Sequence, residues 1–142
     1  MEMLTMIARL FGLIILLSIS ISSAYAAEVL SAPQALERMQ SGELILIDIR
    51  SPGEWKESGI ATSAIPLSIH EDGFLTGLEK IQAENPGKQI ALICATGGRS
   101  ARIQNELEKR NLGSVIDISE GMFGNGRGAG WIKRGLPITK IQ

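Results

Sequence analysis

The residues with the clearest chemical potential form one short stretch, residues 94–100, which reads Cys-Ala-Thr-Gly-Gly-Arg-Ser. This stretch holds the only cysteine of the chain, Cys94. It follows the apolar residues 89–93 and leads into residues 100–110, where Ile103 and Leu107 have the spacing of one helix face. We therefore expect Cys94 to lie at the carboxyl end of a buried strand, just before a helix.

A connection of this kind brings together several groups that stabilise negative charge. Gly97 and Gly98 allow the left-handed backbone that turns consecutive N–H groups toward one point. The start of the following helix adds unpaired N–H groups and the positive end of its dipole, and Arg99 adds a cation. Because such surroundings favour a thiolate over a thiol, we expect Cys94 to be a nucleophile. The alternative is a small buried residue with no chemical role.

The composition is that of one ordinary globular domain preceded by a leader, with 142 residues, 44% hydrophobic, 20% charged and a net charge of −1. No basic excess suggests a nucleic-acid partner. A single cysteine excludes an intramolecular disulfide, and one cysteine with one histidine makes a cysteine-rich metal site implausible. We expect no metal and no organic cofactor.

Residues 1–26 have the features of a secretory signal peptide. Residues 10–21 are apolar but too few to span a bilayer, and Ala24-Tyr25-Ala26 fits the small-x-small cleavage pattern. We expect cleavage before Ala27, a mature domain of residues 27–142 in the periplasm or outside the cell, and no stable membrane insertion. An uncleaved anchor is the alternative. In an oxidising compartment, a lone cysteine is either an intermolecular bridge or a reactive thiol.

The rest of the chain alternates short apolar runs with helical patterns. We expect strands at residues 29–30, 44–49, 64–69, 89–93 and 114–118, and helices after Ser31, after Pro52, over residues 71–83 and after Arg99. This alternation predicts an α/β fold with a mostly parallel sheet and helices on both faces. Pro66 indicates that its strand lies at a sheet edge or turns that position outward.

The strand at residues 44–49 brings Asp48 and Arg50 to its carboxyl end. A buried aspartate needs hydrogen-bonding partners, so we expect this pair to brace the loops around the site without reacting. A simple surface turn is the alternative. Trp55 and Trp131 are more typical of core packing than of ligand binding.

His70 is the only histidine, and a cysteine protease would need an imidazole beside its thiol. No third orienting residue accompanies His70, so we interpret it as an ordinary loop residue. Residues 120–130 contain five glycines without periodicity, which predicts an irregular loop at the same crevice. Met122, Phe123 and Arg127 are expected to shape its entrance. These glycines do not open a complete dinucleotide-binding unit.

Taken together, several stretches resemble the rhodanese-like family. They are residues 46–55, 59–66, 94–100, 120–121, 130–131 and 135–137, which cover almost all of the mature chain. The resemblance implies a single domain with a five-stranded parallel sheet and a persulfide on Cys94. It implies a thiosulfate-like anionic donor, and cyanide, a thiol or a protein cysteine as acceptor. The expected substrate-binding residues are Ala95, Thr96, Gly97, Gly98, Arg99 and Ser100.

Two segments depart from the family pattern. Residues 58–64 read Ser-Gly-Ile-Ala-Thr-Ser-Ala where Gly-His-Ile-Pro-Gly-Ala is common, and the glycine-rich segment before Trp131 is longer. These differences concern substrate preference more than fold.

Two other functions compete with sulfur transfer. Cysteine phosphatases and arsenate reductases share the cysteine-loop-arginine arrangement, but with five intervening residues, whereas four separate Cys94 from Arg99 here. The shorter loop suits one sulfur atom better than a tetrahedral oxyanion, and Ile93 stands where those phosphatases have histidine. The second competitor is a weakly catalytic or non-catalytic module that carries sulfur or binds a partner.

Overall fold

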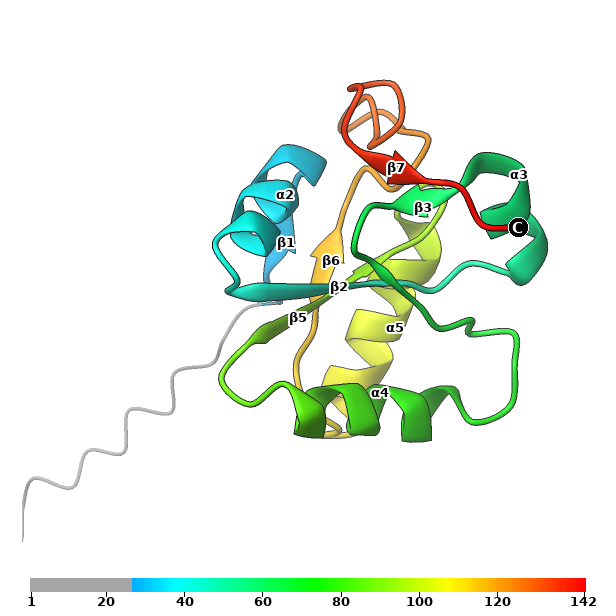
Figure 1. Cartoon of the computed structure of the whole chain (residues 1–142). Helices are drawn as coiled ribbons and strands as arrows, with labels where there is room; N and C mark the ends of the chain where they lie inside the picture. Colours follow the sequence, from blue (N-terminus) through cyan, green and yellow to red (C-terminus); the bar gives the residue numbers. More distant parts are fainter. Residues whose placement is uncertain (1–26) are drawn as a thin grey trace, which may run out of the picture.

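The computed structural model describes residues 27–142, so the predicted signal peptide lies outside the described residues. Five strands form one parallel sheet in the order β1-β6-β5-β2-β4 (Figure 1). The strands are β1 (Val29–Leu30), β6 (Ile116–Ile118), β5 (Gln89–Ile93), β2 (Leu44–Asp48) and β4 (Ile65–Pro66). The predicted α/β fold with a five-stranded parallel sheet is confirmed, and the strand with Pro66 lies at the sheet edge.

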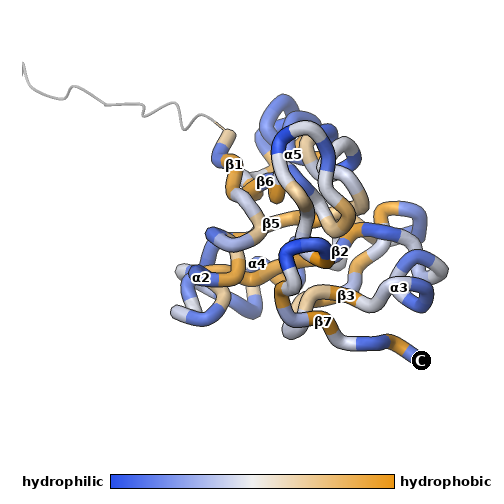
Figure 2. Tube along the Cα trace, turned by 90° about the horizontal axis from the view of Figure 1, so that it is seen from above, coloured by the Kyte–Doolittle hydropathy of each residue, from blue (hydrophilic) through white to orange (hydrophobic). Residues whose placement is uncertain are grey.

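Helices cover both faces of the sheet. Helix α2 (Ala32–Gln40) and helix α3 (Pro52–Ser58) pack on one side, while α4 (Phe74–Glu84) and α5 (Gly98–Lys109) pack on the other (Figure 1). Within β2, Leu46 joins the first core and Ile47 the second, because successive side chains of a strand face opposite ways. Figure 2 shows hydrophobic colour along β2 and β5 between the more polar helices.

Local sequence explains where the helices begin. Ser31 and Ser51 each cap a helix in a reciprocal capping box, with proline in the first turn. Helix α4 starts at Phe74 and not at residue 71, because Gly73 takes a left-handed conformation with φ +86° immediately before it. Within residues 27–142, no helix is both long enough and apolar enough to cross a membrane.

A short antiparallel ribbon joins β3 (Ile60–Ala61) to β7 (Ile138–Thr139) and fastens the end of the chain beside α3 (Figure 1). This ribbon was not predicted, because two-residue strands are too short to show alternation. Trp131 is fully buried in the core beneath α2 and α3, and its Nε1 donates a hydrogen bond to the Pro137 carbonyl at 2.9 Å. The expected core role of Trp131 is confirmed.

Candidate functional site

Cys94 directly follows β5, at the carboxyl end of the parallel sheet, and only 1% of the residue is exposed. Its Sγ accepts a hydrogen bond from the Gly97 amide at 3.1 Å, and the Ser100 hydroxyl lies 3.4 Å away. Gly97 has a φ of +85°, which turns this amide toward the sulfur. Gly98 instead begins α5 in a helical conformation. One backbone amide, and not a series of them, therefore donates to the sulfur among the described residues.

The glycine-rich segment, residues 121–130, supports the cysteine loop from behind. The Asn125 side chain donates to the Thr96 carbonyl at 2.6 Å and to the Ser119 carbonyl at 2.7 Å. The Phe123 amide donates to the Ala95 carbonyl at 2.8 Å. The carbonyls of the cysteine loop are thus held on the protein side, which leaves the exposed Thr96 and Gly98 on the solvent side.

Arg99 is oriented by an acidic partner from a different helix. Its Nη2 and Nη1 donate to the two carboxylate oxygens of Glu54 at 2.6 and 2.9 Å. The hydrogen bond from Arg99 lowers the pKa of Glu54 to about 2. Glu54 in turn raises the pKa of Arg99, and negative charge on Cys94 adds to that effect. Arg99 therefore stays charged, fixed and within electrostatic reach of the sulfur.

His70 contacts this arginine and not the thiol. Its Nε2 lies 3.2 Å from Nη1 of Arg99, and the residue is exposed. In the part of the chain that the structure describes, the hydrogen-bond partners of the Cys94 sulfur are Gly97 and Ser100. A protease-like pair of thiol and imidazole is not formed.

A buried carboxyl group lies behind Ser100 and was missed by sequence reasoning. Ser100 Oγ donates to Asp117 Oδ1 of β6 at 2.6 Å, and Asp117 is 1% exposed. Burial raises the pKa of Asp117, while the Ser100 hydrogen bond and the Arg127 charge oppose that rise. An aspartate between two isoleucines of a buried strand was the available signal, as it was for Asp48.

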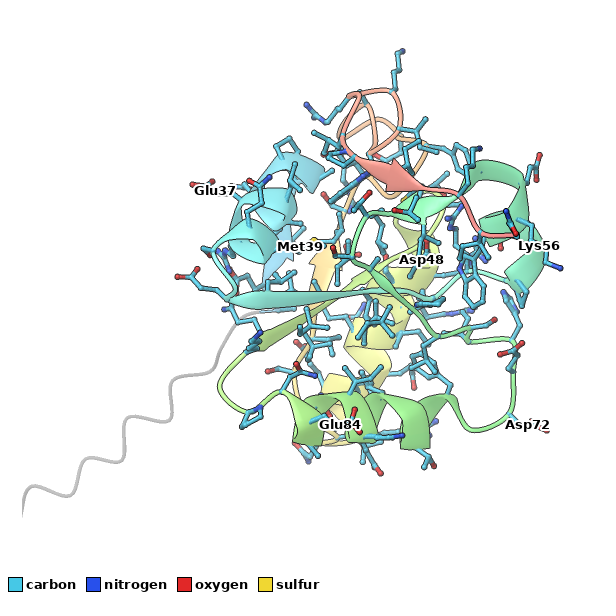
Figure 3. All side chains as sticks on the ribbon, viewed as in Figure 1. Glu37, Met39, Asp48, Lys56, Asp72 and Glu84 are labelled. Atoms are coloured by element: carbon cyan, nitrogen blue, oxygen red, sulfur yellow. The ribbon has the colours of Figure 1, made fainter. Side chains whose placement is uncertain are left out.

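Asp48 and Arg50 form a fully buried pair, with 2.7 Å between Oδ2 and Nη2. Arg50 also donates to the Ser58 hydroxyl and the Gly59 carbonyl, both at 2.8 Å, and Trp55 Nε1 donates to Asp48 at 3.1 Å. Figure 3 shows Asp48 inside the domain, whereas the labelled Glu37, Lys56, Asp72 and Glu84 lie at its periphery. The pair joins the end of β2 to α3 and makes no hydrogen bond to the sulfur.

The entrance residues expected in the glycine-rich segment separate into two groups. Met122 is fully buried and packs in the core with Trp131, so its predicted place at the entrance is wrong. Apolar and polar residues do not alternate in this segment, so the sequence did not indicate that Met122 would be buried and Phe123 exposed. Phe123 is 51% exposed and its ring centroid lies 5.8 Å from Cζ of Arg50. Arg127 is exposed.

Glu120 is a second buried carboxylate that sequence reasoning passed over. Its Oε1 accepts the Ala32 amide at 2.7 Å, and its Oε2 accepts the Gly130 amide at 2.7 Å and Arg134 Nε at 2.8 Å. These contacts lower the pKa of Glu120 against the opposing effect of burial. Glu120 therefore fastens the glycine-rich segment to the start of α2.

The described site is that of a single nucleophile. Residues 27–142 contain no group of three or more His, Cys, Asp or Glu side chains placed to hold a metal ion. The chemistry available here is attack by Cys94 sulfur beside a backbone donor, a hydroxyl and a fixed guanidinium.

A model of the rhodanese-like domain matches residues 31–124 of the chain. The chain belongs to the rhodanese-like family. This rhodanese-like domain is 32% identical over 103 residues to the uncharacterised protein RP600 of Rickettsia prowazekii (strain Madrid E). The alignment covers 65% of this chain and 80% of RP600. Family membership supports sulfurtransferase-type or related activity in general.

Solved structures share the fold of this rhodanese-like domain. Rv0390 from M. tuberculosis has a TM-score of 0.64 at 20% identity, covering 81% of this chain and 98% of the other. A possible tyrosine phosphatase of unknown function from Rhodopseudomonas palustris has a TM-score of 0.61 at 25% identity, covering 80% and 85%. The homodimeric polysulfide-sulfur transferase of Wolinella succinogenes has a TM-score of 0.56 at 23% identity, covering 82% and 80%.

Proposed function

We propose that this rhodanese-like domain is a sulfurtransferase that moves sulfane sulfur from a thiosulfate-like donor to a thiophilic acceptor through a persulfide on Cys94. The observation that carries the proposal is the hydrogen bond from the Gly97 amide to Cys94 Sγ at 3.1 Å. That amide favours negative charge on the sulfur, and Arg99 lies close enough to add a fixed positive charge.

In the first half-reaction, the Cys94 thiolate attacks the outer sulfur of thiosulfate. A bond forms between the two sulfurs, the donor's own sulfur–sulfur bond breaks, and sulfite leaves with the electron pair. The product is a persulfide anion. In the second half-reaction, an acceptor such as cyanide attacks the outer sulfur of the persulfide, and the Cys94 thiolate is regenerated as thiocyanate leaves. A thiol or a protein cysteine is the acceptor class proposed inside the cell envelope.

Two guanidinium groups near the cysteine loop suit an anionic donor. Arg99 is about a quarter exposed at its side chain, which lets it face a donor while Glu54 holds it. Arg127 on the glycine-rich segment is exposed, and its charge opposes the rise in the pKa of Asp117, so a second cation acts on the buried group behind Ser100. The Wolinella transferase, which shares the fold, acts on polysulfide sulfur and adds support for this donor class.

A phosphatase is the second candidate, because a possible tyrosine phosphatase shares the fold at 25% identity. A phosphate dianion would need several loop amides aimed at its oxygens. The loop has four residues between Cys94 and Arg99, and Gly97 donates to the sulfur itself. The loop therefore fits a single sulfur atom better than a phosphate.

The test compares the wild-type protein with the Cys94→Ser variant. Wild type incubated with thiosulfate should gain the mass of one sulfur atom, lose it on addition of cyanide and release thiocyanate, and Cys94→Ser should do neither. Thermal unfolding of both proteins provides the folding control. Thiocyanate formation by Cys94→Ser would eliminate the mechanism. An unmodified but folded wild type would instead favour a binding module, and hydrolysis of an aryl phosphate by wild type alone would favour the phosphatase.

A further inference from the structure

Three buried groups form a continuous chain of hydrogen-bond contacts behind the nucleophile. Cys94 Sγ lies 3.4 Å from Ser100 Oγ, which lies 2.6 Å from Asp117 Oδ1. Their residues are 1%, 0% and 1% exposed, and they come from the end of β5, the first turn of α5 and β6. Sulfur transfer as described above uses the cysteine and leaves the aspartate without a role.

The serine hydroxyl has one proton to donate and three acceptors within reach. Besides Asp117, the Gly97 carbonyl lies 3.2 Å from Ser100 Oγ, and the sulfur itself is the third acceptor. When Asp117 is ionised, the Ser100 hydroxyl donates its hydrogen bond to the carboxylate, across the short distance of 2.6 Å. The Ser100 hydroxyl can donate to a Cys94 thiolate only when Asp117 is itself protonated and donates to Ser100 Oγ. Ionisation at one end of the chain therefore depends on protonation at the other.

The surroundings disfavour two negative charges at once. The strands that flank Asp117 bring the apolar Val29 and Leu92 into register beside it. The charged group that acts on Asp117 is Arg127, and the charged group coupled to Cys94 is Arg99, which Glu54 already pairs. Two anions joined through one hydroxyl in a buried site repel each other, as in other coupled acid pairs. Burial also raises the pKa of Asp117, so this carboxylate accepts a proton more readily than an exposed one.

We propose that Ser100 relays the thiol proton of Cys94 to Asp117, so that a thiolate forms while the buried site keeps a single negative charge. The S–H bond of Cys94 breaks as its proton passes to Ser100 Oγ, while the former hydroxyl proton of Ser100 passes to Asp117 Oδ1. The products are a thiolate that accepts a hydrogen bond from Ser100, and a carboxylic acid that donates to Ser100. Asp117 acts on the sulfur through the serine, as a positioning residue.

The proposal takes Cys94 as the nucleophile of the proposed function, but its test needs no sulfur donor. The ultraviolet absorbance of the thiolate, followed against pH in the wild type, should rise in two steps because the pair titrates jointly. Asp117→Asn removes the competing charge while keeping the shape of the side chain. In that variant the absorbance should rise in one step, at a pH between the two wild-type steps. Iodoacetamide should then alkylate the thiol about tenfold faster at neutral pH, equivalent to a shift of about one pH unit from the upper wild-type step.

The serine variants separate a relay from a simple charge effect. In a Ser100→Ala background, only the through-space repulsion between Asp117 and the thiolate remains, so Asp117→Asn should accelerate alkylation clearly less than it does when Ser100 is present. Ser100→Thr, which keeps a hydroxyl, should restore the wild-type profile. An equal acceleration with and without the hydroxyl would overturn the relay. Should the variants not fold, a single-step thiolate titration of the wild-type protein would overturn it as well. Either result leaves the persulfide measurement untouched, so the two proposals fail independently.

Discussion

Arg99 and Glu54 are joined by a two-pronged ion pair, with 2.6 Å between Nη2 and Oε1 and 2.9 Å between Nη1 and Oε2. Glu54 is also the capping-box residue of α3, where Oε2 accepts the Ser51 amide at 3.0 Å. One carboxylate therefore holds the start of one helix and the cation of the cysteine loop. The orientation of Arg99 beside the sulfur therefore depends on α3, which lies about 45 residues earlier in the sequence.

Replacing Glu54 should weaken sulfur transfer without touching the nucleophile. Glu54→Gln removes the charge that orients Arg99, and we expect the kcat/KM for thiosulfate to fall about tenfold, with most of the change in KM. Steady-state thiocyanate formation measures this. Glu57→Gln, on an exposed position of the same helix, is the matched control and should keep wild-type kinetics. Unchanged kinetics in Glu54→Gln would show that Arg99 needs no partner.

The same ion pair predicts a dependence of stability on acid pH. The pKa of Glu54 is lowered from 4.5 to about 2 in the folded state. A lowered pKa means that the pair stabilises the folded chain fully above pH 4.5, and that this contribution is lost as the pH falls toward 2. The Tm of wild type should therefore exceed that of Glu54→Gln by a constant margin near neutrality, and the margin should shrink on acidification. A margin that grows in acid contradicts the prediction.

Alanine should be tolerated at only one of the two adjacent glycines of the cysteine loop. Gly97 has φ +85°, and an added Cβ would collide with the Ser119 carbonyl. Gly97→Ala should cost about 2 kcal/mol or more in the free energy of unfolding and abolish the persulfide mass gain. Gly98 has open space at its Cβ position, so Gly98→Ala should change the free energy of unfolding by less than about 0.5 kcal/mol. Urea unfolding and mass spectrometry of both variants test the contrast.

The buried pair of Asp48 and Arg50 should matter for stability. Arg50→Met leaves Asp48 buried without its cation, and we expect a loss of about 3–5 kcal/mol in the free energy of unfolding. Arg102→Met changes an exposed arginine of α5 and should alter that free energy by less than about 0.5 kcal/mol. Chemical unfolding of the two variants gives the comparison. Equal losses would show that the pair contributes no more than a surface arginine.

Local patterns predicted the sheet and the nucleophile's place in it. The strand at residues 89–93 was predicted with the bounds of β5, because four apolar residues between turn signals leave few alternatives. Local patterns could not reveal which distant residues hydrogen-bond to the cysteine loop. Glu54 lies 45 residues before Arg99, Asn125 lies 29 residues after Thr96, and their contacts form only on folding. The sequence could have identified Asp117 as a buried group with a hydrogen-bond partner, because a charged residue in an apolar strand requires one.

Glu120 constrains when the rhodanese-like domain can fold during its synthesis. Its carboxylate binds the Ala32 amide across 88 residues of sequence, and it also holds Arg134. Strand β1 also pairs with a segment that is synthesised much later, because its neighbour in the sheet is β6. Helix α2 therefore gains its buried contact with Glu120 only after residue 120 has left the ribosome, so the start of α2 is fixed late in the synthesis of residues 27–142.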